Sequence, residues 1–211
     1  ASFAPAQAES WSRKIAHPVF PPDTSLTEDA VARYMAMPGD SLRALITLEG
    51  GKGVNVTMKK AAYDFARLYQ KTKKDEYADR AVILLERFAE VIPRWPMIDR
   101  SNGSAIPWEK VNWGDWSNSG LWGIWHHQDL ERGRELPLAY DCIAASGALE
   151  RGNARSGRDI RQYIENDLFR FMVEQNLKMS YLVNQLKPLP DGRAPFEFSN
   201  MAGNRFNGLI I

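Results

Sequence analysis

The amino-acid sequence predicts an all-α fold made of consecutive antiparallel helical hairpins, and three observations lead to this prediction. Apolar residues recur three and four positions apart in several long segments, as they do on the buried face of a helix. Short polar links join neighbouring segments, which favours antiparallel packing of consecutive helices. No segment of convincing length alternates apolar and polar residues, so we expect no sheet of more than two short strands.

The first two helices are expected in segments 25–37 and 40–51. The first segment opens with Ser25 and Glu28 at the spacing of a capping box. The second has Asp40 as a suitable N-cap and ends at a Gly-Gly pair. The residues of the first helix expected to face the core are Leu26, Ala30, Val31 and Tyr34.

The two longest periodic segments, 57–73 and 74–96, are expected to form one helical hairpin. The link between them, KTKKD, is so short that the two helices must lie antiparallel. Pro93 ends the second helix, because proline cannot donate the next backbone hydrogen bond. The residues expected to be buried are Met58, Ala61, Ala62, Phe65, Leu68 and Tyr69 in the first helix and Tyr77, Ala81, Leu84, Leu85, Phe88 and Ile92 in the second.

Two further helices are expected in segments 128–149 and 157–178. Pro137 should kink or interrupt the first of them. A connection containing Pro and Gly then leads to a last helix that begins near Asn200. Because this helix is still in progress at Ile211, we expect the natural sequence to continue. The residues expected to be buried are Leu130, Leu138, Tyr140, Ile143 and Ala144, and then Ile160, Ile164, Leu168 and Phe171.

Composition sets the broad class of the protein. The 211 residues carry a formal net charge of +1, so no overall field recruits nucleic acid or an anionic membrane. No window reaches the ~18 apolar residues of a membrane span. We expect an extended N-terminal segment, 1–24, followed by one helical domain, 25–211. The start, ASFAPAQAES, is typical of a mature N-terminus left by signal cleavage or of a cloning scar.

Segment 108–133 is the least ordinary part of the sequence. Tryptophan rings stack on the apolar faces of sugars while the indole N–H bonds a hydroxyl, so a glycan cleft is one explanation. The alternative is that the rings fill gaps between helices. The polar context of Trp116, Trp122 and Trp125 favours a place in a cleft, with at least two of the three partly exposed. Five of the chain's 7 tryptophans lie here: Trp108, Trp113, Trp116, Trp122 and Trp125.

No metal or other cofactor is expected. His126 and His127 are adjacent, so on a helix they point about 100° apart and cannot share one metal ion. Cys142 is the only cysteine, which excludes a Cys-rich site. One histidine is expected to pack at a helix start, and the other to bond a ligand or act as an acid or base. Tyr140 is a candidate for substrate binding or for a buried hydrogen bond with Asp141.

Asn200, Asn204 and Arg205 form a candidate anion site on the last helix. Asn200 and Asn204 are one turn apart and share a face. Asn200 is a natural N-cap, and the positive end of a helix favours a carboxylate. Two interpretations stay open, a structural capping network and recognition of a carboxylate ligand.

Three motifs in this order resemble the heparinase II/III-like and alginate-lyase-like polysaccharide lyases. The stretch YQKTKKDEYADRAVILLERFAEVIPRWP is similar to their hairpin helices. The stretch DLERGRELPLAYDCIAASGAL is similar to a helix that ends in an Ala-Tyr-Asp element. The stretch SNMAGNRFNGLI is similar to a later helix whose asparagine faces a uronic acid. The resemblance extends from about Ser25 onward.

The resemblance implies an incomplete (α/α) toroid that precedes a β-sandwich part. It also implies cleavage of an acidic polysaccharide by β-elimination, in which a Tyr or His removes the C5 proton and an Asn, Arg or His neutralises the carboxylate. Asn200 or Asn204 matches the carboxylate-facing position. Arg205 stands where the family has a histidine, and the usual base and acid are expected beyond Ile211. We expect a secreted or periplasmic location.

Two other functions compete with this one. An (α/α)-barrel glycoside hydrolase would use carboxylates near the tryptophans, namely Asp115, Asp129 or Glu131. A non-catalytic helical module would use the tryptophans to bind a glycan or a protein. The identity of the glycan, endo or exo action and the oligomeric state do not follow from the sequence.

Overall fold

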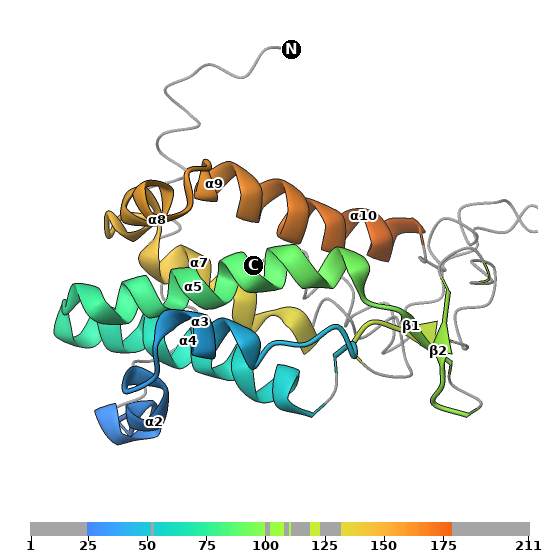
Figure 1. The fold of residues 1–211 in the computed structure, drawn as a ribbon, viewed down its shortest axis with the longest axis horizontal. Coiled ribbons are helices and arrows are strands. Elements are labelled where there is room, and N and C mark those ends of the chain that lie inside the picture. The colour runs from blue at the N-terminus through green and yellow to red at the C-terminus, as the bar shows by residue number, and fades with distance from the viewer. Residues whose placement is uncertain are drawn as a thin grey trace, which may run out of the picture.

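The computed structural model describes residues 25–51, 53–99, 102–107, 110, 119–122 and 132–178. This part of the chain is mostly helical, which confirms the prediction of a helical fold (Figure 1). No helix within it is long and apolar enough to cross a membrane. The elements are η1 (Glu28–Ala30), α2 (Ala32–Met35), α3 (Gly39–Ala44), α4 (Val54–Thr72), α5 (Asp75–Val91), η2 (Ile92–Arg94), β1 (Met97–Asp99), β2 (Ala105–Ile106), β3 (Ser119–Gly120), α7 (Glu135–Ile143), α8 (Ala148–Ser156), α9 (Ile160–Tyr163), the π-helix η5 (Ile164–Arg170) and α10 (Phe171–Lys178).

Helices α4 and α5 form the predicted hairpin. Lys73 takes a left-handed conformation at the end of α4 (φ 57°), and its N–H bonds the carbonyl of Tyr69 at 2.7 Å, so the chain reverses within two residues. Every position expected to be buried in this hairpin is buried, except Tyr69, which is half-buried. Pro93 lies in η2 directly after α5, as expected of a residue that ends a helix. The strong apolar period of both segments was therefore sufficient to predict this hairpin.

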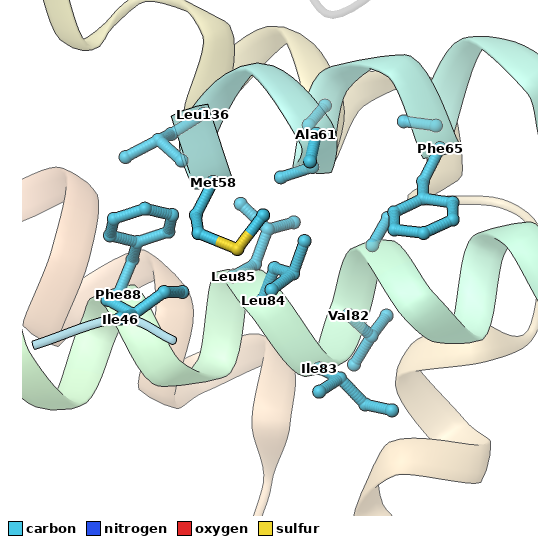
Figure 2. Packing of buried hydrophobic residues seen from close by; sticks show 14 of the residues in the cluster. Ile46, Met58, Ala61, Phe65, Val82, Ile83, Leu84, Leu85, Phe88 and Leu136 are labelled. Carbon is cyan, nitrogen blue, oxygen red and sulfur yellow. The ribbon is translucent and has the colours of Figure 1, made fainter. Parts of the chain in front are cut away.

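Helix α5 is buried on two opposite sides. Toward α4, Leu85 and Phe88 pack against Met58 (Figure 2). Val82 and Ile83 lie on the other side of α5 in the same view. There α3 and α8 cover the helix, and the rod of α9, η5 and α10 runs beside it (Figure 1). The helix is thus the centre of the core, between elements that precede it and elements that follow it.

The N-terminal helices differ from the sequence-based expectation in their caps. The first element is the 3-10 turn η1, whose N-cap is Thr27, and it has no side-chain cap, so the capping box is not the start of this element. Helix α3 begins at Gly39 behind Pro38, which places Asp40 inside the first turn. In place of the single expected helix, Val31 (φ −117°) separates η1 from α2. Of the positions expected to face the core, Leu26, Val31 and Tyr34 are buried and Ala30 is exposed.

Segment 128–149 was expected to hold one helix, and this expectation is wrong at its C-terminal end. Helix α7 ends at Ile143, and α8 follows after a turn through Gly147 (φ 74°). Pro137 lies in the first turn of α7, just after a break at Arg134, so it interrupts the helix as expected. The buried face is Leu136, Ala139 and Ile143, while the expected Leu138, Tyr140 and Ala144 are only half-buried.

Helices α9 and α10 continue one another through the π-helix η5. Asp159 caps the rod, its carboxylate accepting the N–H of Gln162 at 3.0 Å. The residues that face the core lie four apart, and on an α-helix this spacing rotates each successive side chain by about 40° around the helix axis. A π-helix has more residues per turn, so the same spacing rotates the side chain in the opposite direction. The two rotations offset each other, and the buried residues form a straight stripe along the rod. The stripe consists of Ile160, Ile164, Leu168 and Met172, whereas the expected Phe171 is half-buried.

A small antiparallel sheet follows η2, with strand order β2-β1-β3. Ile98 pairs with Ala105 on one side and with Gly120 on the other. The expectation of at most two strands in a sheet is therefore wrong. Each strand has only two or three residues, too few for an alternating pattern to be seen in the sequence.

Two carboxylates on α5 hold the neighbouring helices by ion pairs. Glu86 is buried and lies between Arg43 of α3 at 2.9 Å and Arg155 of α8 at 3.0 Å. Glu90 is half-exposed and bonds Arg87 at 2.8 Å and Arg43 at 2.9 Å. The hydrogen bond from Arg87, together with the charges of Arg87, Arg43 and the nearby Arg94, lowers the pKa of Glu90.

Candidate functional site

The structure describes two of the predicted site residues, Trp122 and Tyr140. The remaining candidates lie outside the described residues, and their placement stays a prediction. They are Trp116, Trp125, His126, His127, Asn200, Asn204 and Arg205, together with the carboxylates Asp115, Asp129 and Glu131 of the hydrolase alternative.

Trp122 is part of the core. Its side chain is 3% exposed. Its ring meets Trp95 edge to face at 4.9 Å between centroids and Phe88 at 6.0 Å. Strand β3 ends two positions earlier and pairs with β1, which returns the chain to the core at this point. Trp122 is therefore not one of the partly exposed rings, and the prediction that at least two of the three are exposed depends on Trp116 and Trp125, which lie outside the described residues.

Lys59 of α4 lies over the ring of Trp122 and was not predicted as a site residue. It is 6% exposed, and its ammonium nitrogen lies 5.0 Å from the centroid of the Trp122 ring. The ammonium also donates to the backbone carbonyl of Arg132 and pairs with Glu135 at 2.9 Å. The sequence contained a signal, because Lys59 lies one turn from Asn55 on the buried face of α4.

The loop before α4 holds Trp122 from another direction. The N–H of Gly51 donates to the carbonyl of Leu121 at 2.9 Å. A Cβ on Gly51 would lie 2.4 Å from the Cα of Trp122, so only glycine fits here. Asn55 is fully buried and fixes this loop, donating to the carbonyl of Gly50 at 2.6 Å and accepting from Thr47 N–H at 2.9 Å.

Trp122 and Gly133 lie side by side, although ten residues separate them in the sequence. A Cβ on Gly133 would be 3.0 Å from the indole nitrogen of Trp122 and 2.5 Å from the Cε of Met172. The guanidinium of Arg132 donates to the carbonyl of Trp122 at 3.4 Å. We call Trp122, Arg132 and Gly133 the neck. The two residues that flank segment 123–131, Trp122 and Arg132, therefore lie together at one place in the described core.

Tyr140 projects from α7 toward the rod of α9 and η5. Its hydroxyl donates to Glu165 and accepts from Arg161 at 3.2 Å, and its ring meets Phe169 edge to face at 5.2 Å. Asp141 is exposed, so the expected buried pair with Tyr140 is wrong. Burial, followed by the hydrogen bond to Glu165, raises the pKa of Tyr140 to about 12. A phenol in this environment is a poor proton acceptor, and its described contacts are structural.

The described residues also bear on metal binding. Among them, no three His, Cys, Asp or Glu side chains come together in a group that could hold a metal ion. All 3 histidines of the chain lie outside the described ranges. Cys142 is half-buried on α7, and burial raises the pKa of its thiol, so it is a weak nucleophile.

Comparison of the sequence with protein-family models, with curated proteins and with solved structures found no significant match. The site is therefore defined by its geometry. It has an enclosed tryptophan, a buried lysine and two closely packed glycines, Gly51 and Gly133.

Proposed function

We propose that this chain is the helical part of a polysaccharide lyase that cleaves a uronic-acid-containing glycan by β-elimination. The observation that carries the proposal is the neck, Trp122 with Arg132 and Gly133. In the neck the residues that flank segment 123–131 meet on the helical core, and that segment contains Trp125, His126 and His127. Binding and catalytic side chains occur most often on loops held in this way.

The order of the helical elements supports the same proposal. The stretch that resembles the lyase hairpins begins at Tyr69 in the last turn of α4 and includes all of α5, and α7 contains the Ala-Tyr-Asp element. In this proposal the hairpins belong to an incomplete (α/α) toroid within a domain that covers residues 25–211. The ligand is an acidic polysaccharide or oligosaccharide outside the cytosol.

The chemistry requires a base, an acid and a partner for the carboxylate. The C5 proton passes to the base, the C4–O bond breaks, the leaving oxygen takes a proton, and a C4–C5 double bond forms. Negative charge grows on the uronate carboxylate during this step, so hydrogen bonds that strengthen there lower the barrier. Asn200 or Asn204, with Arg205, would supply them, and His126 or His127 would serve in proton transfer.

Trp116 and Trp125 remain the proposed stacking residues. The ring of Trp122 is enclosed in the core, so we assign it no stacking contact with the sugar. Tyr140 has its hydroxyl engaged by Glu165 and Arg161, so we assign no substrate contact to it.

The test is incubation of the protein with a panel of uronate polymers, namely polymannuronate, polyguluronate, heparan sulfate and chondroitin sulfate. An increase in ultraviolet absorbance from a conjugated C4–C5 double bond is expected on one of them. If new reducing ends form without this absorbance, the result would favour a glycoside hydrolase that uses Asp115, Asp129 or Glu131 in place of a lyase. Binding without any cleavage would favour a carbohydrate-binding module or a part of a lyase that lacks the full catalytic set.

A further inference from the structure

We infer that four arginines around the C-terminal half of α5 form a binding surface for the anionic groups of an acidic glycan. This inference rests on the proposed function for the class of ligand, and every residue that carries it is described. One arginine lies on α3, one on α5, one on η2 and one on α8. They are Arg43, Arg87, Arg94 and Arg155, and we call them the arginine row.

The arginine row is contiguous, because its members share carboxylates. The Oε2 atom of Glu86 accepts from Arg43 at 2.9 Å and from Arg155 at 3.0 Å. Arg43 also reaches Oε2 of Glu90 at 2.9 Å. The other oxygen of Glu90, Oε1, lies 2.8 Å from Nη1 of Arg87. Arg43 therefore joins Arg155 of α8 to Arg87 of α5 through two glutamates.

Arg94 extends the row at its exposed end. Its Nη1 lies 3.9 Å from Oε1 of Glu90, which is beyond hydrogen-bond distance. Its side chain is 58% exposed, whereas those of Arg87 and Arg43 are 21% and 27% exposed. The guanidinium of Arg94 can therefore bind an anion without giving up its ion pair as a structural bond.

The arginine row carries more positive charge and more donors than its two glutamates match. Two carboxylates offset two of the four guanidinium charges. Four guanidiniums have about twenty N–H donors, while two carboxylates offer about eight acceptor sites. Burial raises the pKa of the nearby Tyr163, on which the charges of Arg158 and Asp167 act in opposite directions. These two neighbours offset each other, so the excess of positive charge stays with the row.

The excess fits the anionic groups of a glycan better than a nucleic acid. A guanidinium binds a carboxylate through two parallel hydrogen bonds, and the proposed substrate is a polymer of uronic acids. Binding of single-stranded nucleic acid combines a long positive groove with aromatic rings on which the bases stack. The row is built of arginines and glutamates, and the whole chain has a formal net charge of only +1, which gives no long-range field.

The test measures binding of hexasaccharides from the same uronate panel by calorimetry at low ionic strength, where exposed charges are least screened. Arg94→Gln should weaken binding about threefold and Arg94→Glu about tenfold, as expected for one exposed charge contact and for its reversal. Glu90→Gln should strengthen binding about threefold, because it removes a negative charge from the row. Arg170→Gln is the matched control and should bind as wild type does, since Arg170 is 69% exposed and pairs with Glu174 alone at 2.7 Å.

The opposite signs expected for Arg94→Gln and Glu90→Gln separate ligand binding from a purely structural network. Unchanged binding in both variants would overturn the inference, and cleavage of the glycan at the wild-type rate would then leave the proposed function standing. Equal weakening in Arg94→Gln and Arg170→Gln would also overturn it, because binding would follow the overall charge. So would binding of a single-stranded oligonucleotide in place of every glycan. Binding that depends on Arg94, without cleavage, would support the inference and leave the proposed cleavage unsupported.

Discussion

Adding one methyl group at Gly51 tests the docking of Trp122 directly. In Gly51→Ala the new Cβ would lie 2.4 Å from the Cα of Trp122 and 2.6 Å from the carbonyl oxygen of Leu121. Both are backbone atoms, so no side-chain rotation relieves the overlap. The loop cannot easily withdraw either, because Asn55 holds the carbonyl of Gly50 at 2.6 Å. The loop and the neck must therefore separate.

The loss of unfolding free energy depends on which kind of atom the new Cβ contacts. Overpacking costs about 1–3 kcal/mol, and a contact with backbone belongs at the upper end, so we expect Gly51→Ala to lose about 3 kcal/mol. Gly133→Ala would meet the flexible end of Met172 at 2.5 Å and the indole nitrogen of Trp122 at 3.0 Å, both of them side-chain atoms, and should lose about 1–2 kcal/mol. Gly39→Ala would meet Ile83 at an ordinary 3.5 Å. It should gain up to about 0.5 kcal/mol because α3 begins there.

Thermal and urea unfolding, followed by circular dichroism, measure this series. A loss of 3 kcal/mol corresponds to a melting temperature lower by about 6–12 °C in a chain of this size. From the most to the least stable, the variants should rank Gly39→Ala, Gly133→Ala and Gly51→Ala. If Gly51→Ala were as stable as Gly39→Ala, the loop would not lie against Trp122, and the description of the neck would be wrong.

The remaining predictions concern ionisable groups. Glu86→Gln should lose about 2 kcal/mol in urea unfolding, because it leaves the guanidiniums of Arg43 and Arg155 without their shared carboxylate; a loss as small as that of Glu90→Gln, at most about 1 kcal/mol, would contradict this. The pKa of Glu90 is lowered, so its stabilising effect is complete above the unfolded pKa and is lost as pH falls through the folded one. Glu90→Gln and wild type should therefore converge in stability in acid. The pKa of Tyr140 is raised to about 12. The stabilisation that its neutral hydroxyl contributes is therefore complete below about pH 10 and is lost toward pH 12. Tyr140→Phe should show a shallower loss of stability over this interval in alkaline unfolding curves, and an identical slope would count against the raised pKa.

The parts of the fold that could be predicted from the sequence are those with a long apolar period. The hairpin α4–α5 repeats its buried residues over many turns, so its faces were predicted correctly. Helix α8 was missed because the period appeared to continue through Ser146 and Gly147, where the chain turns. The sheet was missed because its strands are shorter than one alternation. In α8 and in the small sheet, contacts with residues distant in the sequence determine the local conformation.

The candidate site shows a similar division. The sequence identified the tryptophan-rich segment as unusual, but its polar neighbours favoured a place in a cleft for Trp122. Its burial depends on contacts with Trp95 and Gly51, which are distant in sequence and leave no local pattern. Lys59 could have been identified, because it interrupts the apolar face of α4 one turn after Asn55. Its partner Arg132 could not, since a backbone carbonyl carries no sequence signal.

The central place of helix α5 has a consequence for the order of folding. Its partner α4 is joined to it by a two-residue link, so little loop entropy opposes their pairing. Arg155 reaches Glu86 from 69 positions along the chain, and such distant contacts form late. Truncating Leu85, which faces α4, should therefore slow refolding, whereas Glu86→Gln should mainly accelerate unfolding. Stopped-flow measurements would then show that the contacts on the α4 side of helix α5 form early in folding and that the ion pair of Glu86 with Arg155 forms late.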